Sequence, residues 1–174
     1  MTPARTPRSA RAREVVVAAR ALVEAEGREA LTMRRLGEAL GIRAPSLYKH
    51  VADKAAVETA LVEEVLAEVG AVLHRAAERG MSVAAVLAAY RRYGLAHSHL
   101  YRLATGGPID RAALPPGLEE WTGEPFLVVA GDEHRARALW SLAHGMVVLE
   151  IDGRYPAGAR LDEAWRAGAA AFAR

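Results

Sequence analysis

The sequence predicts an all-α protein of about nine helices, and three observations lead to this fold class. Strand signals are nearly absent, because the only β-branched clusters, at residues 15–17 and 127–129, are short and have no hairpin turn nearby. Apolar residues instead recur at helical spacing along most of the chain. Alanine accounts for 38 of the 174 residues, so it makes up much of the 52% of residues that are hydrophobic. Alanine is the strongest helix former.

Nine segments carry the helical pattern. We expect helices over about residues 11–26, 33–40, 44–50, 54–78, 83–96, 98–103, 118–130, 133–149 and 160–173. Side chains suited to cap a helix N-terminus precede four of them, at Thr32, Asp53, Ser82 and Asp132. Glycines that can end a helix follow four, at Gly27, Gly41, Gly80 and Gly153. Gly123 and Pro125 lie inside the seventh segment, so the pattern does not decide whether this segment is a helix. Residues 105–117 form one clear loop.

Apolar stripes mark the sides of the helices that we expect to face a core. The first helix has its stripe at Val15, Ala19 and Leu22. The long fourth helix has its stripe at Val57, Leu61, Val65, Val69 and Leu73. The ninth helix has its stripe at Leu161, Trp165, Gly168 and Phe172.

Charge divides the chain unequally. The net charge of +2 hides a basic N-terminal part, because residues 1–54 contain 11 Lys or Arg and six Asp or Glu, a net of +5. Residues 55–174 contain 12 and 15, a net of −3. Such an asymmetry suggests a basic module joined to a neutral or acidic one.

The first 13 residues contain four arginines and no acid. A targeting peptide would need an apolar segment, which Glu14, Arg20 and Glu24 interrupt. A disordered, solvated tail and a basic arm that follows the phosphates of a nucleic acid both fit the composition. We expect residues 1–9 to be a basic flexible arm.

The second and third helices have the spacing of a helix-turn-helix. Small Gly37 would let a second helix approach closely, and Gly41 supplies a turn position free to take a positive φ. Leu47 would then pack back against Leu36 and Leu40. Two short helices that cross steeply around such a turn form this motif.

The polar side of the third helix favours DNA as the partner. Ser46, Lys49 and His50 would share this side, with Tyr48 close by, on a helix slim enough to enter a major groove. The same residues would also suit an exposed amphipathic helix whose polar side is merely solvated. Both lysines of the chain, Lys49 and Lys54, fall here, which is mild support for the first interpretation.

At this point the sequence resembles the TetR family DNA-binding domain. The resemblance covers about residues 10–56 and rests on the stretch from Leu31 to Ile42, then on Ala44-Pro45-Ser46-Leu47-Tyr48-Lys49-His50-Val51 and Asp53-Lys54. It implies an all-α homodimer with an N-terminal three-helix domain that binds operator DNA and a variable C-terminal domain that binds an inducer. Val51 departs from the phenylalanine of many members, which should affect only core packing.

The resemblance also implies a set of DNA-contacting residues. They are Thr32, Arg34, Arg43, Ala44, Pro45, Ser46, Tyr48, Lys49, His50 and Lys54. Lys54, at the start of the fourth helix, would bind phosphate with help from the helix dipole. Because Ala44 holds a position where other members place base-reading polar residues, Arg43 or Lys49 is expected to carry more of the specificity.

The C-terminal part resembles the TetR C-terminal domain type named for its Trp, His and Gly. The resemblance covers about residues 82–172 and rests on Tyr90-Arg91, Tyr101-Arg102-Leu103, the stretch from Trp140 to Gly145 and the stretch from Leu149 to Gly153. It implies an architecture but no defined ligand. We therefore expect residues 10–54 to form the DNA-binding domain and 55–174 a helical ligand-binding and dimerisation domain.

Five aromatic or histidine residues are candidates for a ligand pocket: Tyr90, His97, Tyr101, Trp140 and His144. The first three share one helix face if the fifth helix continues through His97. Together the five could line a cavity with a few convergent polar groups. They could equally be ordinary core residues whose polar tips reach backbone partners, and one residue could do both.

The eighth helix favours dimerisation. From residue 138 to 149 it has no charged residue, which is too apolar for a helix that packs only within its own chain. With Gly168 and the alanine-rich side of the ninth helix, it suits a four-helix bundle across a two-fold axis.

Composition and motifs argue against other classes. The absence of cysteine excludes disulfides, thiolate metal sites and cysteine nucleophiles, and no apolar stretch approaches the roughly 20 residues that span a bilayer. His97-Ser98-His99 and Asp132-Glu133-His134 are the only clusters resembling metal sites, and His97 and His99 cannot share a helix face. No Gly-rich phosphate loop or nucleophile elbow is present. We expect no enzyme activity, no metal and no cofactor.

These observations converge on a DNA-binding transcriptional regulator that acts in the cytoplasm. We expect a repressor that binds a palindromic, double-stranded operator as a homodimer and is released by a small-molecule inducer of unknown identity, with no membrane partner. The alternative is a helical protein-interaction module without regulated DNA binding.

Overall fold

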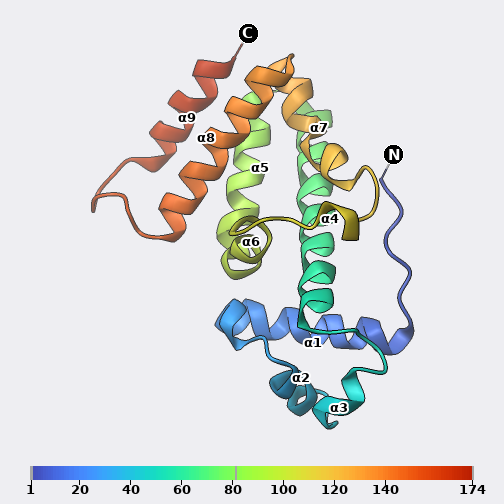
Figure 1. Ribbon diagram of the computed structural model, residues 1–174. Helices are drawn as coiled ribbons and strands as arrows, with labels where there is room; N and C mark the ends of the chain where they lie inside the picture. The colour runs from blue at the N-terminus through green and yellow to red at the C-terminus, as the bar shows by residue number, and fades with distance from the viewer. Residues whose placement is uncertain (1, 81, 174) are drawn as a thin grey trace. The chain divides into compact units, whose positions relative to one another are not determined.

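The computed structural model describes residues 2–80 and 82–173, and all regular secondary structure in these ranges is helical (Figure 1). The α-helices are α1 (Ala10–Glu26), α2 (Met33–Ala39), α3 (Ala44–Leu47), α4 (Lys54–Gly80), α5 (Val83–Ala96), α6 (Ser98–Thr105), α7 (Leu118–Ala130), α8 (Glu133–Ile151) and α9 (Leu161–Phe172). Two short 3-10 helices are η1 (Arg28–Ala30) and η2 (Arg111–Ala113). The predicted all-α fold class is confirmed.

The chain forms two compact units. The first unit contains the residues up to Leu66 together with His97–Leu118, and the second contains Ala67–Ala96 and the residues from Glu119 onward. The division between them falls within α4, not after residue 54, where the charge changes. The segments expected from the sequence, 1–9, 10–54 and 55–174, are divisions by function and stay predictions.

Helix α1 is central to the core of the first unit. It contacts α2, η1 and α6, and Figure 1 shows it lying across α2 and α3. Val15, Ala19 and Val23 are fully buried, whereas Leu22, expected to face inward, is half-buried. The inward side of α1 therefore lies slightly away from the predicted stripe. The predicted stripe of α4 is correct, since Val57, Leu61, Val65, Val69 and Leu73 are all buried.

The turn between α2 and α3 depends on two glycines. Gly41 takes a φ of +65°, the left-handed conformation that its position was expected to need. At Gly37 the chain passes so close that an added Cβ would lie 2.7 Å from the Ile42 carbonyl oxygen and 3.1 Å from the Ala44 backbone nitrogen. Leu36 and Leu47 are fully buried, whereas Leu40, the third residue expected in this contact, is half-buried.

Helix α3 is shorter than the expected 44–50. Its α-helical part ends at Leu47, and residues 48–50 continue as a turn. The His50 N–H donates to the Leu47 carbonyl three residues back at 2.8 Å, and the Val51 N–H donates to the same carbonyl at 3.1 Å. Such bonds tighten the last turn of a helix, and here they end α3 before Tyr48.

The N-terminal segment before α1 is held against α4. The Thr6 backbone N–H donates to one carboxylate oxygen of Glu63 at 2.9 Å, and the Arg8 guanidinium bonds to the other. Only 1% of Glu63 is exposed, so this carboxylate needs such partners to offset the loss of its hydration. The basic arm stays a prediction, but the charge of Arg8 is already paired.

Helix α7 forms in spite of Pro125. A proline has no N–H, so the Trp121 carbonyl four residues earlier loses its bond within the helix. His74 of α4 supplies a replacement, because its Nε2 lies 2.9 Å from that carbonyl oxygen and its ring stacks on the Trp121 indole. Side-chain packing across the second unit therefore decides a helix that the local pattern left open.

In the second unit, α5 packs against both α8 and α9. A polar network ties these helices together. Arg91 of α5 donates to Glu150 of α8 at 3.0 Å and to Asp162 of α9 at 2.5 Å, and the Trp165 indole N–H donates to Glu150. Arg91 also lies 5.5 Å from the centre of the Trp165 ring.

We predict that Gly37→Ala destabilises the protein, although alanine is the better helix former. The new Cβ would meet backbone atoms that cannot move aside cheaply, and overpacking of this kind costs about 1–3 kcal/mol. Urea unfolding followed by circular dichroism measures the change. Gly123→Ala is the control, because Gly123 is exposed in α7 with open space around its Cβ position, and there we expect no loss. Equal stability of the two variants would contradict the close approach.

Candidate nucleic-acid interface

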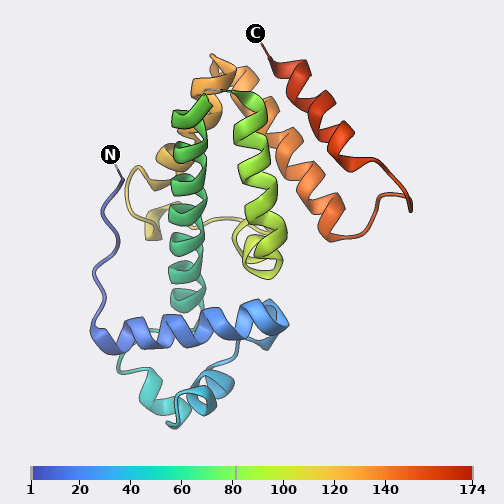
Figure 2. The same cartoon turned by 180° about the vertical axis from the view of Figure 1, so that it is seen from behind.

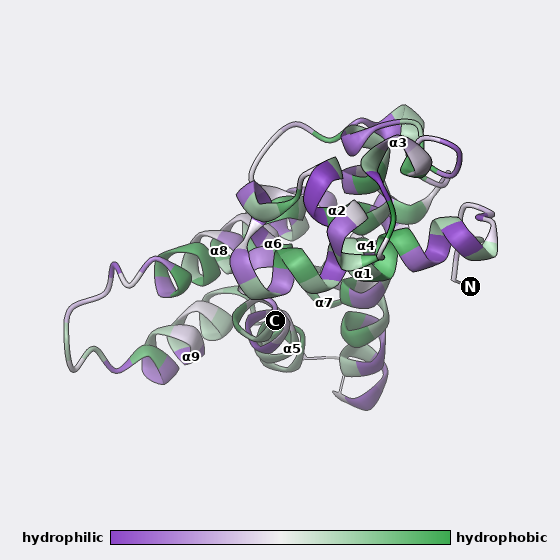
Figure 3. Cartoon of the chain, turned by 90° about the horizontal axis from the view of Figure 1, so that it is seen from below, coloured by the Kyte–Doolittle hydropathy of each residue, from purple (hydrophilic) through white to green (hydrophobic). Residues whose placement is uncertain are grey.

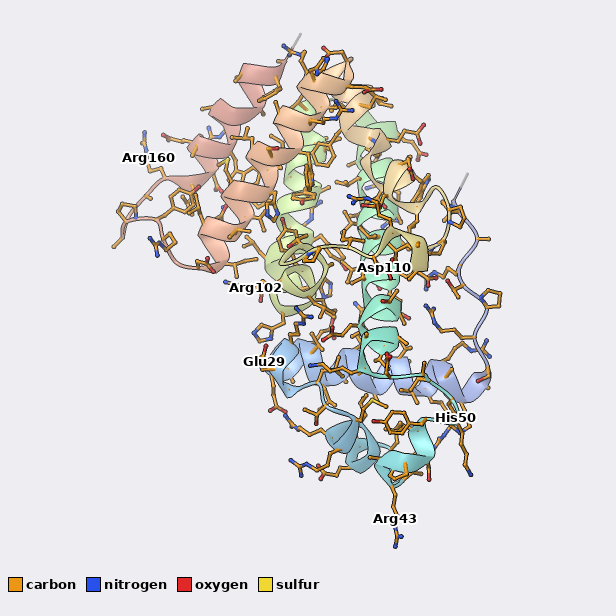
Figure 4. The ribbon with its side chains drawn as sticks, viewed as in Figure 1. Glu29, Arg43, His50, Arg102, Asp110 and Arg160 are labelled. Carbon is orange, nitrogen blue, oxygen red and sulfur yellow. The ribbon has the colours of Figure 1, made fainter. Side chains whose placement is uncertain are left out.

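Four side chains at α3 and the turn after it are free to meet a partner. Arg43, Tyr48, Lys49 and His50 are exposed, and their side chains make no hydrogen bond or ion pair with another described residue. Tyr48 leaves 55% of its surface open, although tyrosines usually bury their rings. Figure 4 shows Arg43 projecting into solvent before α3 and His50 beyond its end.

At least six of the ten other arginines of the first unit are paired with acids. The pairs are Arg8 with Glu63, Arg11 with Glu14, Arg20 with Glu24, Arg28 with Glu58, Arg34 with Glu38 and Arg35 with Glu26. Their charges are partly used within the protein. Arg43 and Lys49, whose charges are not, are therefore the cations of the helix-turn-helix that can neutralise phosphate without first giving up an acid.

Residues 44–46 are small or short where α3 begins. Arg43 precedes the helix as its N-cap, Pro45 stands in the first turn, and Ala44 and Ser46 are half-buried. None of these three side chains reaches far, which would allow the backbone to approach another surface closely. Any long-range contact from this end of α3 must then come from Arg43.

The other three predicted contact residues already have partners. The Thr32 hydroxyl caps α2 by accepting from the Arg35 N–H at 3.2 Å, and Arg34 bonds to Glu38 at 2.8 Å. Lys54 lies 3.5 Å from Glu58. The Arg34 pair is well exposed, so it can exchange partners at little cost.

Lys54 belongs to a tighter group. Arg28 holds Glu58 with two hydrogen bonds, at 3.0 and 2.9 Å, and this bonding lowers the pKa of the Glu58 carboxyl below its usual value. The carboxylate stays charged beside Lys54. A phosphate at the start of α4 would have to compete with it for the Lys54 ammonium.

The five candidate ligand residues fall in different places. Tyr90, Trp140 and His144 belong to the second unit, and His97 and Tyr101 belong to the first. Helix α5 ends at Ala96, so the condition for one shared helix face, that it continue through His97, is not met. A single pocket formed by the five stays a prediction.

Their individual surroundings differ as well. Tyr90 is buried with its ring edge-on to Phe126, and Tyr101 is 1% exposed. His97 bonds to Glu24 of α1 at 3.0 Å. Trp140 is 48% exposed and stacks on His144, and the partial burial of His144 lowers the pKa of its imidazole. Tyr90 and Tyr101 thus have the burial of core residues, while Trp140 and His144 are accessible.

Over residues 2–80 and 82–173, no three His, Asp or Glu side chains gather in a way that could hold a metal ion. In the same ranges, no helix has the length and apolar character needed to cross a bilayer.

Sequence reasoning missed three features of these units. They are the Arg8–Glu63 pair, the His74–Trp121 contact and the Arg91 network. Each joins residues far apart in the sequence, and only the position of Glu63 amid the apolar residues of α4 could have hinted at a buried, paired carboxylate.

Two family models match the chain. Residues 15–61 match the model described as bacterial regulatory proteins, tetR family. Residues 83–172 match the tetracyclin repressor-like C-terminal domain, which does not confirm the predicted Trp-His-Gly type.

Three known proteins resemble the chain over most of its length. An uncharacterised HTH-type transcriptional regulator of Mycobacterium tuberculosis, Rv0681, is 28% identical over 152 residues, 80% of this chain and 69% of the relative. Apo ActR from Streptomyces coelicolor is 26% identical with a TM-score of 0.58, over 94% of this chain and 75% of the other. A protein of unknown function from Rhodococcus sp. RHA1 shares the fold, with a TM-score of 0.78 at 23% identity over 94% of each chain.

The N-terminal match covers the helix-turn-helix that holds the free side chains Arg43, Tyr48, Lys49 and His50. The C-terminal match alone covers half of the chain. The chain therefore belongs to the tetR family of bacterial regulatory proteins, and it is a DNA-binding transcription regulator, not an enzyme.

Proposed function

We propose that this regulator is a repressor that binds a pseudo-palindromic operator as a homodimer and leaves it when a small molecule binds. The observation that carries the proposal is the group of exposed, unpaired side chains Arg43, Tyr48, Lys49 and His50 at α3. Cations that need not give up an acid suit phosphate, and Tyr48 and His50 suit phosphate or base edges. Chromosomal DNA as the partner implies action in the cytoplasm.

The exposed sides of α8 and α9 support the homodimer. Trp140 and Leu149 of α8 are large hydrophobic residues left 48% and 42% exposed, and exposed apolar surface of this kind marks interfaces. Ala164, Ala167 and Ala171 form an exposed row of small residues on α9. Gly168, which we expected at the dimer contact, instead faces Leu142 of the same chain, with its Cβ position 3.0 Å from that side chain.

A dimer is also what operator recognition asks for. Two helix-turn-helix units reading one face of DNA need half-sites roughly 34–36 Å apart, which a two-fold axis provides. The symmetry of the protein is then repeated in the operator as an inverted repeat.

Release would require coupling between a ligand and α4. The helix begins at Lys54, near the proposed interface, and from Ala67 onward its residues belong to the second unit. A ligand that tilts α4 would change the separation of the two α3 segments in the dimer. A coupling of roughly 1–3 kcal/mol would suffice. Tyr90, His97, Tyr101, Trp140 and His144 remain the proposed ligand residues.

Selection of DNA from a random pool by the purified protein tests this function most directly. Recovery of an inverted repeat would support DNA reading and symmetry together. Recovery of no preferred sequence, or DNA binding that does not weaken steeply with salt, would favour the helical protein-interaction module instead.

Tyr48→Ala should weaken binding to the selected DNA by about 1 kcal/mol or more, the scale of a good base contact. Because Tyr48 is exposed and has no internal partner, the fold should not change. Fluorescence anisotropy with labelled DNA measures the affinity. Tyr155→Ala, in the second unit, serves as the control, and equal affinities of the two variants would remove Tyr48 from the interface.

Arg43→Gln should make DNA binding less sensitive to salt. If Arg43 neutralises one phosphate, the slope of log K against log salt should fall by about 1. The measurement is anisotropy across a salt series, with Arg137→Gln on exposed α8 surface as the control. An unchanged slope but relaxed sequence preference would reassign Arg43 from phosphate to a base.

Ala167→Glu should convert the dimer to monomers, because it places a charge within the alanine row of α9. Sedimentation equilibrium at micromolar protein measures the mass. Ala25→Glu, an exposed change on α1, should leave the dimer intact. A monomeric unmodified protein would contradict the dimer itself.

A further inference from the structure

A groove of about 500 Å³ lies between α5 and α9 of the second unit. Its walls are mainly apolar, and the proposed ligand residues Tyr90, Trp140 and His144 take no part in it. Figures 1 and 2 show that α5 and α9 run in opposite directions. The Arg91–Asp162 bond, which joins the late part of α5 to the start of α9, agrees with this arrangement.

Two exposed arginines line the groove, one in the last part of α5 and one at the middle of α9. Arg92 on α5 and Arg166 on α9 both line it and are exposed. The Arg92 side chain makes no ion pair or hydrogen bond with another described residue, and the Arg166 side chain donates only its Nε–H, to the Asp162 backbone carbonyl at 3.1 Å. The Asp162 carboxylate lines the groove as well, and the hydrogen bond from Arg91, followed by the charges of Arg91 and Arg166, lowers its pKa.

The end of the groove formed by the start of α5 and the last part of α9 is apolar. Because the helices are antiparallel, Ala169 on α9 lies toward the part of α5 that holds Ala84, Leu87 and Ala88. These side chains offer no hydrogen-bonding group. From Ala84 to Leu95 the lining of α5 extends over about 16 Å of helix, at 1.5 Å per residue.

The two exposed arginines and the apolar end of the groove define the ligand chemistry. We propose that the α5–α9 groove binds an amphiphilic carboxylate, with the anionic head between Arg92 and Arg166 and the hydrocarbon part along Ala84, Leu87 and Ala88. A guanidinium with free N–H groups is well suited to a carboxylate. Trp165, at the middle of the groove, packs its ring against the chain of the ligand.

This site differs from the proposed dimer contact. Asp162, Trp165, Arg166 and Ala169 face the groove, whereas Ala164, Ala167 and Ala171 lie on another side of α9. Figure 3 shows that α9 carries both hydrophilic and hydrophobic stretches. The proposal concerns binding alone and holds whether or not the ligand acts on DNA affinity.

Isothermal titration calorimetry of the full chain with decanoate and with decan-1-ol tests the charge requirement. The two probes share a hydrocarbon chain and differ in the head group. We expect decanoate to bind at least tenfold more tightly. Equal affinity for both probes, or no heat for decanoate below its micelle concentration, would overturn the proposal.

Paired variants locate the head group. Arg92→Gln combined with Arg166→Gln should lower the affinity for decanoate at least tenfold and leave that for decan-1-ol within about twofold. Arg137→Gln, an exposed arginine on α8, is the control and should change neither. Both arginines are exposed, so the fold should persist, as circular dichroism would verify. Unchanged decanoate binding by the double variant would overturn the assignment.

A blocking variant locates the chain. Ala88→Phe, at an exposed position of α5, should weaken both probes. The double variant Trp121→Phe/Trp140→Phe keeps Trp165 as its one tryptophan. We expect the fluorescence of Trp165 in this variant to change when decanoate binds. If Ala88→Phe dissociates the dimer while binding of decanoate is unaffected, the groove is a subunit interface and the proposal is wrong.

Discussion

A backbone contact inside the helix-turn-helix positions the proposed DNA-binding surface, on which the proposed function depends. The start of α3 passes Gly37 at a distance that leaves no room for a Cβ, since that atom would lie 2.7 Å from the Ile42 carbonyl oxygen. Leu36 on α2 and Leu47 on α3 are both fully buried beside this approach. With Leu47 anchored, Tyr48, Lys49 and His50 can only lie outward. The close approach at Gly37, which leaves no room for a side chain, thus orients the polar residues after Leu47.

Pairing of charges decides which cations remain for a partner. Arg8, Arg28, Arg34 and Arg35 bond to acids of the first unit, so the basic excess of the N-terminal residues overstates the charge that DNA would meet. The same logic applies in the second unit. Arg91 forms ion pairs with Glu150 and Asp162, whereas the side chain of its sequence neighbour Arg92 forms none with a described residue. Adjacent arginines therefore have different chemistry, structural in one case and available in the other.

Local patterns predicted the helices well wherever the signal lay within a few residues. The caps at Thr32, Asp53, Ser82 and Asp132 each accept a backbone N–H as expected, and the apolar stripe of α4 is buried. The pattern did less well where a distant residue intervenes. No local pattern indicates that His74 bonds to the Trp121 carbonyl, which Pro125 leaves without its partner in the helix. The sequence therefore could not decide whether α7 forms. The shared face of the candidate ligand residues was also not predictable from the local pattern. It required α5 to continue through His97, but α5 ends at Ala96.

The sequence by itself determined the all-α fold class, the helix-turn-helix and the family, because capping, helical period and the glycine turn act over short stretches of chain. Only the tertiary structure decided which charges are paired, how α7 is completed, and that α5 and α9 enclose a groove lined by two exposed arginines and by apolar side chains. The physical reason is the sequence distance of the partners, which is 55 residues for Arg8 and Glu63, 47 for His74 and Trp121, and 71 for Arg91 and Asp162. Interactions of that range depend on how the helices pack, which no local pattern records.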